Sequence, residues 1–300
     1  MSNQVSTSFA RRYEPMFQML AQQTTSYFKD KVRLKTVTDG ESWSIDQLGA
    51  VGVTEITGQR QAISLGNTPH QRRLVEKRSF YFADTVEEQD LTKLITDPTS
   101  DYTKNGLMAL ERRLDQLIID AALGSAKIGK DGGTTVTFAN DTNGVGGAGG
   151  QTIVHGSAGL SYAKLLETRK KFHQRNVFPK KICFAIAPDQ EEDLLNISQF
   201  VNGDFRSQKP LDNTTGKEGY IGSFMEFEFY RSNQLALDTT TRSCIAWDKD
   251  GIGAIVGIAP KVILEHRPDM AGSPLQVQVV MQAGASRLDG DRVIEVQCTE

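Results

Sequence analysis

The hydrophobic pattern predicts one long amphipathic helix near the middle of the chain. In the stretch TKNGLMALERRLDQLIIDAAL, residues 103–123, apolar side chains recur at spacings of three and four and so share one stripe of an α-helix. At 1.5 Å per residue this helix is about 30 Å long. Ser100 and Asp101 are candidate N-caps, and Gly124 is a candidate C-terminal stop. The polar face should meet solvent or a neighbouring subunit and carries Lys104, Glu111, Arg112, Asp115 and Asp120.

Two segments before this helix cannot enclose a core of their own. Apolar residues between Phe9 and Lys29 fall near helical spacing, with Pro15 as an interruption, so they predict an amphipathic arm. From Arg33 to about Asp90 the pattern changes to a period of two, which predicts two long extended segments joined by a polar tip. An isolated hairpin is marginal in water. We therefore expect an arm that clasps another chain, with half of a β-sandwich as the alternative.

The rest of the chain predicts a mixture of strands and helices. A Gly-rich stretch, residues 124–159, reads as a long loop, and Ser161 caps a helix after it. Residues 182–187 form a continuous apolar run, which is typical of a strand buried on both faces, and Pro188 begins another helix.

The C-terminal third predicts strands only. GYIGSFMEFEFYRSNQL reads as a strand pair, and SCIAWDKDGIGAIVGI reads as two strands around a DKDG turn. The last alternating segments, PLQVQVVMQAGASRL and VIEVQCTE, predict a terminal hairpin around DGDR.

Composition argues against several classes of function. The chain is 38% hydrophobic and 24% charged with a formal net charge of -3, which is typical of a soluble protein and not of a nucleic-acid binder. Cys183, Cys244 and Cys298 lie far apart, so they predict neither a disulfide framework nor a zinc site and fit a reducing compartment. The polar start MSNQVSTS and the lack of a long apolar run predict neither a signal peptide nor a membrane span.

Two glycine motifs fail on their context. Gly144, Gly146 and Gly149 have the spacing of a dinucleotide-binding loop, but the following QTIVHG does not open a helix that could hold a pyrophosphate. The segment HGSAG at residues 155–159 has His155 where a nucleophile elbow requires glycine.

The candidate ligands for a metal fail on spacing. Asp248 and Asp250 resemble the start of a calcium loop, but Ala259 occupies the position where that loop needs a glutamate, so a hairpin turn explains them better. The four histidines have no partners at metal-ligand spacing. We therefore expect no catalytic residue, no metal and no cofactor, and a protein that is not an enzyme.

A basic cluster stands out before the long helix. Arg72, Arg73, Lys77 and Arg78 form the densest positive patch. They are either a solvated strand face or a contact to an acidic neighbouring subunit. The positions expected at subunit contacts are Phe9, Tyr13, Phe17, Arg60, Arg72, Arg73, Lys77, Arg78, Glu111 and Arg112.

The order of these parts resembles the major capsid proteins of tailed bacteriophages, which have the Hong Kong 97-type fold also seen in encapsulin shells. The likeness covers nearly the whole chain. After the arm it runs through RLKTVTDGESWSIDQLGAVGVTEITG, DPTSDYTKNGLMALERRLDQLIIDAALGSA, KKICFAIAPDQEEDLL, GYIGSFMEFEFYRSNQL and QAGASRLDGDRVIEVQCTE. The second of these is similar to the spine helix of the family, and the last is similar to its final hairpin.

The resemblance implies an α+β chain with named parts. We expect an N-terminal arm at residues 1–32, an extended β-hairpin loop at 33–90 and an axial domain at 159–259. The peripheral domain would combine residues 91–158 and 260–300 and contain the spine helix, residues 103–123.

The resemblance also implies a function. Subunits of this family form pentamers and hexamers, lay the loop and arm across neighbours, and build an icosahedral shell around double-stranded DNA. The short segment before Arg33 implies a separate scaffolding protein. Other expected partners are a portal protein and the packaged DNA, through non-specific contact, with a cement protein as a further candidate. No contact with a membrane is expected.

The expected location is the virion, after assembly in the cytoplasm of a bacterial host. Two alternatives stay open. One is an encapsulin-like compartment that holds enzymes, and the other is a hydrolase or binding enzyme with a β-rich substrate domain.

Overall fold

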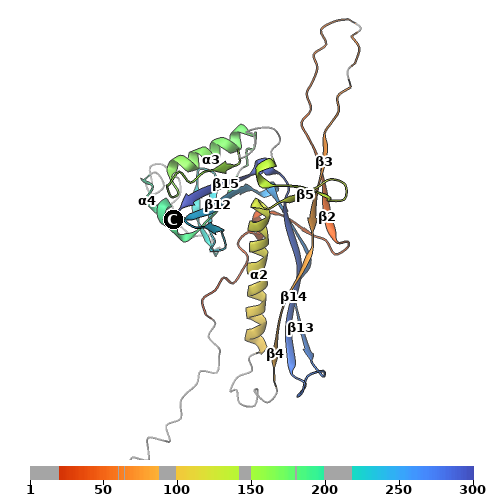
Figure 1. Ribbon diagram of the computed structural model, residues 1–300, viewed down its shortest axis with the longest axis vertical. Helices are drawn as coiled ribbons and strands as arrows, with labels where there is room; N and C mark the ends of the chain where they lie inside the picture. The colour runs from red at the N-terminus through yellow and green to blue at the C-terminus, as the bar shows by residue number, and fades with distance from the viewer. Residues whose placement is uncertain are drawn as a thin grey trace, which may run out of the picture.

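The protein is elongated, with a long loop projecting from one end and a helix and sheet reaching the other (Figure 1). The computed structural model describes residues 20–59, 61–63, 65–87, 99–141, 150–179, 181–198 and 218–300. Within these residues the chain forms three β-sheets and the helices α2, α3 and α4. This is the α+β class that the sequence predicts.

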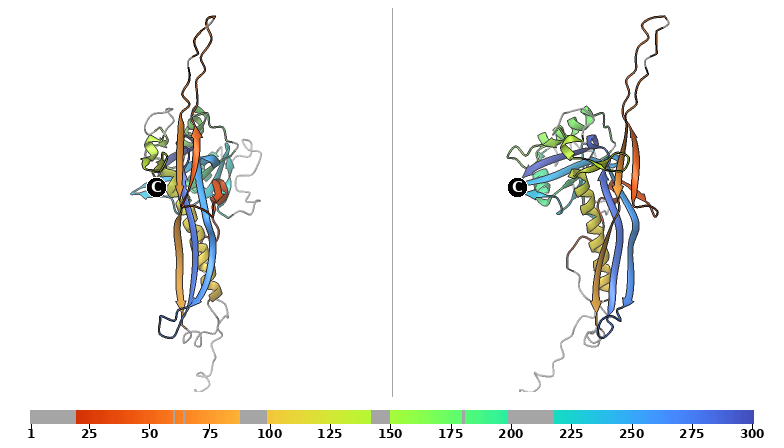
Figure 2. Two further views of the ribbon diagram at one scale, coloured as in Figure 1. Left: turned by 90° about the vertical axis from the view of Figure 1, so that its right-hand side faces the viewer. Right: turned by 45° about the vertical axis from the view of Figure 1, so that its right-hand side comes forward.

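The first sheet packs against the long helix. Its strand order is β1-β13-β14-β4, and the strands are β1 (Arg33–Thr36), β13 (Ile252–His266), β14 (Leu275–Arg287) and β4 (Arg78–Val86). Helix α2, Thr99–Leu123, lies along one face of this sheet (Figure 2). At Gly106 the helix comes close to the sheet, because a Cβ there would lie 2.8 Å from both Phe82 and Val279.

Most of the predicted apolar stripe of α2 is buried: Leu110, Leu114, Leu117 and Ile118 are at most 7% exposed. At the ends of the stripe, Leu107 and Ala121 are only partly buried, and Ala122 is fully buried instead. The helix starts at Thr99, so the predicted N-caps Ser100 and Asp101 lie inside its first turn, where short polar and acidic side chains are also favourable. The predicted stop at Gly124 is confirmed, since its N–H bonds Asp120 O at 2.8 Å and a Cβ would lie 2.6 Å from that oxygen.

The second sheet forms the compact part of the molecule. Its strand order is β7-β15-β12-β8-β10-β9, with β11 beside β12. The strands are β7 (Thr152–Ile153), β15 (Val293–Thr299), β12 (Thr241–Asp248), β8 (Ile182–Ile186), β10 (Phe227–Arg231), β9 (Tyr220–Phe224) and β11 (Leu237–Asp238). All five residues of β8 are buried, as the apolar run predicts.

Both helices of this part begin where the sequence places them. Helix α3, Tyr162–Gln174, is capped by Ser161, whose side chain accepts from the N–H of Lys164. Helix α4, Pro188–Asn196, starts at its proline directly after β8.

The third sheet carries the projecting loop. Its order is β2-β3-β5-β6, with β2 (Ser42–Leu48), β3 (His70–Glu76), β5 (Ala126–Ile128) and β6 (Thr134–Val136). Strands β2 and β3 pair antiparallel as far as Leu48 and His70, and the N–H of Gly49 bonds Pro69 O at 2.9 Å. Residues 49–69, called the projecting loop below, continue beyond this pair (Figure 1). The long excursion predicted between the arm and the helix is therefore present.

The predicted return strand of the excursion is in fact two strands. The chain changes sheets at Lys77, so β3 pairs with β2 while β4 pairs with β14. Lys77 is fixed at this point, because its N–H bonds Glu41 O at 3.0 Å and its Nζ donates to Val37 O at 2.7 Å.

The predicted C-terminal hairpin is wrong. Strand β14 pairs with β13 and β4, while β15 pairs with β12 and β7 in the second sheet. Alternation fixes which residues face inward but not which strand lies alongside, and here the 3₁₀ turn η6, Gly290–Arg292, carries the chain between sheets.

The predicted DKDG hairpin is wrong for the same reason. The segment forms η5, Lys249–Gly251, which joins β12 in the second sheet to β13 in the first. Leu288 and Asp289 close this passage through N–H bonds to Gly251 O.

The predicted pair in GYIGSFMEFEFYRSNQL is confirmed as β9 and β10. Met225 and Glu226 form the turn, with φ values of 51° and 73°. None of the helices within the described residues is long and apolar enough to cross a membrane.

Candidate functional site: projecting surfaces and their anchors

The projecting loop exposes apolar side chains that lack a core. Val53 is 99% exposed and Leu65 is 92% exposed, and Val51, Ile56 and Ile63 are exposed as well. Large apolar groups gathered on an extended segment are typical of a protein interface. The loop therefore has the character of an arm that binds another surface.

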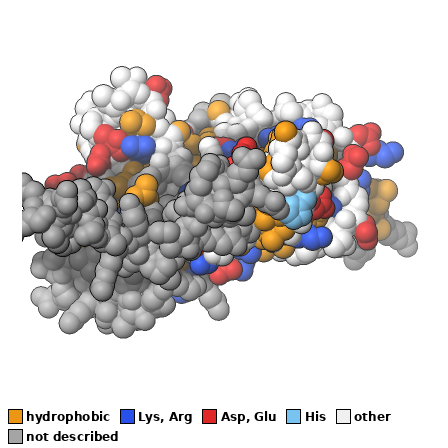
Figure 3. Space-filling model, turned by 90° about the horizontal axis from the view of Figure 1, so that it is seen from below, with side chains coloured by type: hydrophobic (Ala, Val, Ile, Leu, Met, Phe, Trp, Pro, Cys, Tyr) orange, Lys and Arg blue, Asp and Glu red, His pale blue; other side chains and the backbone are white. Residues whose placement is uncertain are grey.

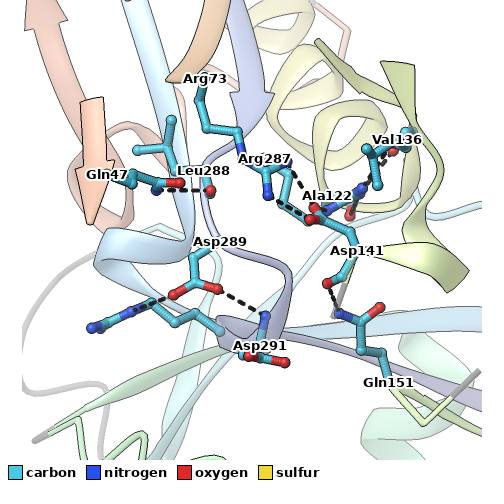
Figure 4. A network of polar contacts seen from close by, with 12 residues as sticks. Gln47, Arg73, Ala122, Val136, Asp141, Gln151, Arg287, Leu288, Asp289 and Asp291 are labelled. Carbon is cyan, nitrogen blue, oxygen red and sulfur yellow. Dashed lines mark hydrogen bonds and ion pairs between the residues drawn. The ribbon is translucent and has the colours of Figure 1, made fainter. Parts of the chain in front are cut away.

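A buried ion cluster fixes the base of this loop. Arg73 of β3 donates from Nη2 to Asp141 Oδ1 at 2.5 Å, and Arg287 of β14 donates from Nε to Asp141 Oδ2 at 2.6 Å (Figure 4). The Arg73 and Arg287 side chains are at most 3% exposed. One carboxylate thus joins two sheets, and removing it would leave two buried charges without their partner.

Arg287 extends the same cluster to the end of the long helix. Its Nη1 donates to Ala122 O at 2.9 Å and to Gly124 O at 2.7 Å, and its guanidinium lies 5.2 Å from the ring centre of Phe138. A cation is favourable there, because the last carbonyls of a helix carry partial negative charge. Burial lowers the pKa of Arg287, and Asp141 opposes that shift.

A second anchor holds residues 23–28 against the long helix. Asp115 of α2 accepts hydrogen bonds from Gln23 Nε2 and Ser26 Oγ at 2.5 Å, Tyr27 N at 2.9 Å and Phe28 N at 3.2 Å. The sequence places Asp115 on the exposed face of the helix, and this is wrong, since it is 1% exposed. Burial raises the pKa of Asp115, while the four hydrogen bonds act to lower it.

The segment after Phe28 is fixed on the second sheet. Phe28 packs edge-on against Trp247 with ring centres 5.2 Å apart, and Trp247 Nε1 donates to Lys31 O at 3.0 Å. Lys31 Nζ donates to Glu228 Oε2 at 2.5 Å, and Lys181 Nζ donates to Glu228 Oε1 at 2.6 Å.

Two opposing effects act on the pKa of Glu228. Burial acts to raise the pKa of Glu228, but the hydrogen bonds from Lys181 and Lys31 outweigh it and hold the pKa below the ordinary value. The carboxylate therefore stays charged between its two lysines at neutral pH.

The basic cluster predicted from sequence is split between several environments. Arg72 pairs with Asp46 across the β2/β3 hairpin at 2.6 Å, and Arg78 is exposed. Arg73 is buried against Asp141, and Lys77 bonds Val37 O. The structure does not bring these four side chains together on one face.

Neither of the two predicted contact residues of α2 is fully exposed, and Arg112 meets the N-terminal segment. Arg112 Nη1 donates to Gln22 Oε1 at 2.5 Å and to Gln23 O at 3.3 Å, and Glu111 beside it is half-buried. Four other predicted contact residues, Phe9, Tyr13, Phe17 and Arg60, lie outside the described residues.

Charges of both signs are interspersed on the end opposite the loop. The space-filling view from that end shows basic, acidic and apolar side chains mixed over the described surface (Figure 3). Electrostatic attraction to a highly charged polymer requires a surface patch of charges of a single sign, and a mixed surface does not provide one.

The titratable groups of the described residues form no metal-binding cluster of three or more His, Cys, Asp or Glu side chains. Cys183, Cys244 and Cys298 are buried and free, and burial raises the pKa of Cys183 well above its ordinary value. A thiol held protonated in this way is a poor nucleophile.

Sequence reasoning misses Asp115 and Asp141 as structural centres. Asp115 borders the apolar stripe of α2 beside Leu114 and Ile118, which is the signal that could have marked it as buried. Asp141 lies within the Gly-rich stretch and meets partners 68 and 146 residues away, so no local pattern indicates it.

Comparison with known proteins assigns nearly the whole chain to one family. Residues 5–300 match the family model described as phage capsid protein. The search of curated proteins found no match.

Solved structures share the fold at low identity. The capsid of the cyanophage P-SCSP1u has a TM-score of 0.73 and 15% identity, covering 99% of this chain and 94% of that chain. The cyanophage Pam1 capsid has a TM-score of 0.72 and 10% identity over 98% and 97%. A chain from Mycobacterium phage Che8 has a TM-score of 0.69 and 15% identity over 96% and 97%.

Proposed function

Because this chain belongs to the phage capsid protein family, its function is that of a major capsid protein, and we propose that it builds an icosahedral shell from pentamers and hexamers around double-stranded DNA. The projecting loop is the observation that carries the proposal. It exposes large apolar side chains in a single chain while an ion cluster holds its base rigidly. Such a surface gains its stability when a neighbouring subunit covers it.

Several parts of the chain take distinct roles in this proposal. We assign residues 1–32 to the arm, 33–90 to the extended loop, 91–158 and 260–300 to a peripheral domain with α2 as its spine, and 159–259 to an axial domain. Strand pairing motivates two adjustments. Strand β15 goes with the axial domain because it pairs with β12, and β13 goes with the peripheral domain throughout because it pairs with β14.

The proposed subunit contacts rest partly on the structure and partly on the sequence pattern. Arg72 and Arg78 keep an outward role, whereas Arg73 and Lys77 act within the chain. Arg112 acts through the arm, whose Gln22 it contacts, together with Glu111, Phe9, Tyr13 and Phe17. Arg60 acts from the part of the sequence that lies between β2 and β3.

The proposed partners beyond the subunit itself are a separate scaffolding protein and a portal protein, with a cement protein as a further candidate. Contact with the packaged DNA is non-specific, in keeping with the net charge of -3. Assembly takes place in the bacterial cytoplasm and the product is the virion shell. We propose that the protein acts by assembly and not by catalysis. An encapsulin-like compartment is not favoured, because the matched family and the solved structures compared above are phage capsids.

Shortening the loop tests this proposal. Residues 49–69 are replaced by an Asn-Gly turn, which suits the antiparallel ends of β2 and β3 at Leu48 and His70. The expected product is a folded subunit with an unchanged melting temperature that forms no shells in electron micrographs. Normal shells from the shortened chain would contradict the role of the loop.

A further inference from the structure

The second sheet brings together two cysteines that lie far apart in the sequence. Strands β12 and β15 run side by side (Figure 1), with Cys244 opposite Val296 and Cys298 opposite Arg242. Cys244 and Cys298 are therefore diagonal neighbours on one face of the sheet. Both side chains are fully buried, at 0% exposure.

The two thiols are in contact with each other. A hydrogen bond joins the side chains of Cys244 and Cys298, and Cys298 Sγ also lies 4.0 Å from Val296 O. Both cysteines are free in the structure. A covalent bond requires the two sulfur atoms to approach to about 2.05 Å, which needs rotation of the side chains and a small approach of the strands.

The surroundings favour the thiolate of Cys298 over that of Cys244. The hydrogen bond with Cys244 lowers the pKa of Cys298, burial opposes this shift, and the ammonium of Lys164 supports it. The same hydrogen bond, together with burial, raises the pKa of Cys244 well above its ordinary value. Cys298 is therefore the better nucleophile of the two, because the thiolate is the reactive form.

Lys164 is fixed beside this pair by backbone carbonyls. It lies in the first turn of α3 and is 8% exposed. Its Nζ donates to Ala158 O at 2.7 Å and to Gln297 O at 2.9 Å, next to Cys298 in β15. A positive charge held close to a thiol stabilises the thiolate.

The third cysteine has a different environment and serves as an internal comparison. Cys183 of β8 lies opposite Trp247 of β12. Trp247 and Cys244 are three positions apart in the same strand, so Cys183 and Cys244 lie on opposite faces of the sheet. Burial raises the pKa of Cys183 well above its ordinary value, which leaves it as an unreactive thiol.

We propose that Cys244 and Cys298 form a disulfide when the protein meets a peroxide outside the reducing cytoplasm, and that this bond joins β12 covalently to β15. The setting rests on the proposed function, because a released shell leaves the compartment that keeps thiols reduced. The reactivity of the pair does not depend on it.

The reaction takes place in two steps. The Cys298 thiolate attacks one oxygen of hydrogen peroxide and becomes a sulfenic acid, and the hydroxide that leaves takes up the thiol proton to form water. The sulfur of Cys244 then attacks the sulfur of Cys298 and displaces its oxygen as a second water. The two thiols lose two electrons, which reduce one peroxide to two waters.

Thiol counting on the purified whole chain tests the pair. The reduced protein, unfolded in guanidinium, should show three reactive thiols, one for each cysteine. After treatment of the folded protein with dilute hydrogen peroxide it should show one. Mass spectrometry of a non-reducing digest should find this thiol at Cys183 and a bridge between Cys244 and Cys298, and dithiothreitol should restore all three thiols.

The melting temperature provides a second measurement. Peroxide should raise it by about 5 °C, because the bond restricts the unfolded chain. Cys183→Ser should keep this rise and Cys298→Ser should lose it. The second variant also controls for oxidation of methionine, which dithiothreitol does not reverse.

Three results would overturn the inference. These are three thiols after peroxide, a bridge that includes Cys183, and further oxidation of Cys298 without a bridge. If Cys298→Ser does not fold, the thiol count and the digest of the parent protein still give the answer. None of these measurements requires a shell, so absence of shells would contradict the proposed function alone.

Discussion

The carboxylate of Asp115 accepts a hydrogen bond from the backbone N–H of Phe28 at 3.2 Å, which ties the long helix to a segment 87 residues earlier in the chain. Together with Gln23, Ser26 and Tyr27, this contact fixes residues 23–28 on the helix. The arm proposed for residues 1–32 needs such a rigid origin, because freedom at its base would raise the entropy cost of docking.

Replacing this carboxylate should loosen the arm. Asp115→Ala leaves the buried N–H groups of Tyr27 and Phe28 without their acceptor, so we expect a loss of about 2–3 kcal/mol in the free energy of unfolding. Asp120→Ala, at an exposed position of the same helix, should change it by less than about 0.5 kcal/mol. Urea unfolding measures both, and equal effects would contradict the anchor.

Breaking the ion cluster at the base of the loop should lower the free energy of unfolding more than Asp115→Ala does. Asp141→Asn leaves Arg73 and Arg287 buried without a counter-charge, so we expect a loss of about 3–5 kcal/mol. Asp46→Asn breaks the exposed pair with Arg72 and should have a much smaller effect, because solvent screens an exposed ion pair. If thermal unfolding ranks the two variants the other way, the cluster is not what holds the loop base.

The ion pairs of Glu228 with Lys31 and Lys181 predict that the stability of the protein depends on pH. The pKa of Glu228 is lowered on folding, so its contribution to stability is present above the ordinary value of 4.5 and is lost as the pH falls through the lower folded value. Glu228→Gln should cost about 2 kcal/mol at pH 7. The gap to the parent protein should narrow below about pH 4.5.

The control for this variant is Glu226→Gln, which removes a more exposed ion pair with Arg169 and should cost less than about 1 kcal/mol. Denaturant unfolding at pH 7 and below about pH 4.5 measures the free energy of unfolding of each variant and of the parent protein. A gap that stays constant with pH would show that shape and not charge explains the effect of Glu228→Gln.

Gly284 provides a test of the packing between β14 and β3. A Cβ there would lie 1.8 Å from the carbonyl oxygen of Glu76, a backbone atom that cannot move aside alone. Gly284→Ala should therefore lower the free energy of unfolding by about 3 kcal/mol. Gly133→Ala, where a Cβ meets nothing within 4 Å, should be close to neutral, and a similar loss from both would contradict the close approach.

Local periodicity predicts the elements well. The stripe of α2, the Ser161 cap of α3, the buried strand β8 and the start of α4 at Pro188 all follow from neighbouring residues, because each depends on contacts within a few positions. The resemblance in the order of parts then predicts the fold, which the family match and the solved structures confirm.

Partner choice over long separations could not be predicted. Alternation in β14 and β15 fixes their inward faces, but it cannot show that β15 joins β12 in another sheet. The same limit applies to single polar residues. Asp115 and Asp141 become structural centres only because distant segments bring donors to them, and the Gly-rich sequence before Gln151 carries no periodic signal.

Electron microscopy of the protein, expressed alone and together with its neighbouring genes, tests whether the chain builds shells. A capsid protein should give closed shells or sheets of pentamers and hexamers in at least the second condition. A small monodisperse particle under both conditions would contradict a shell function.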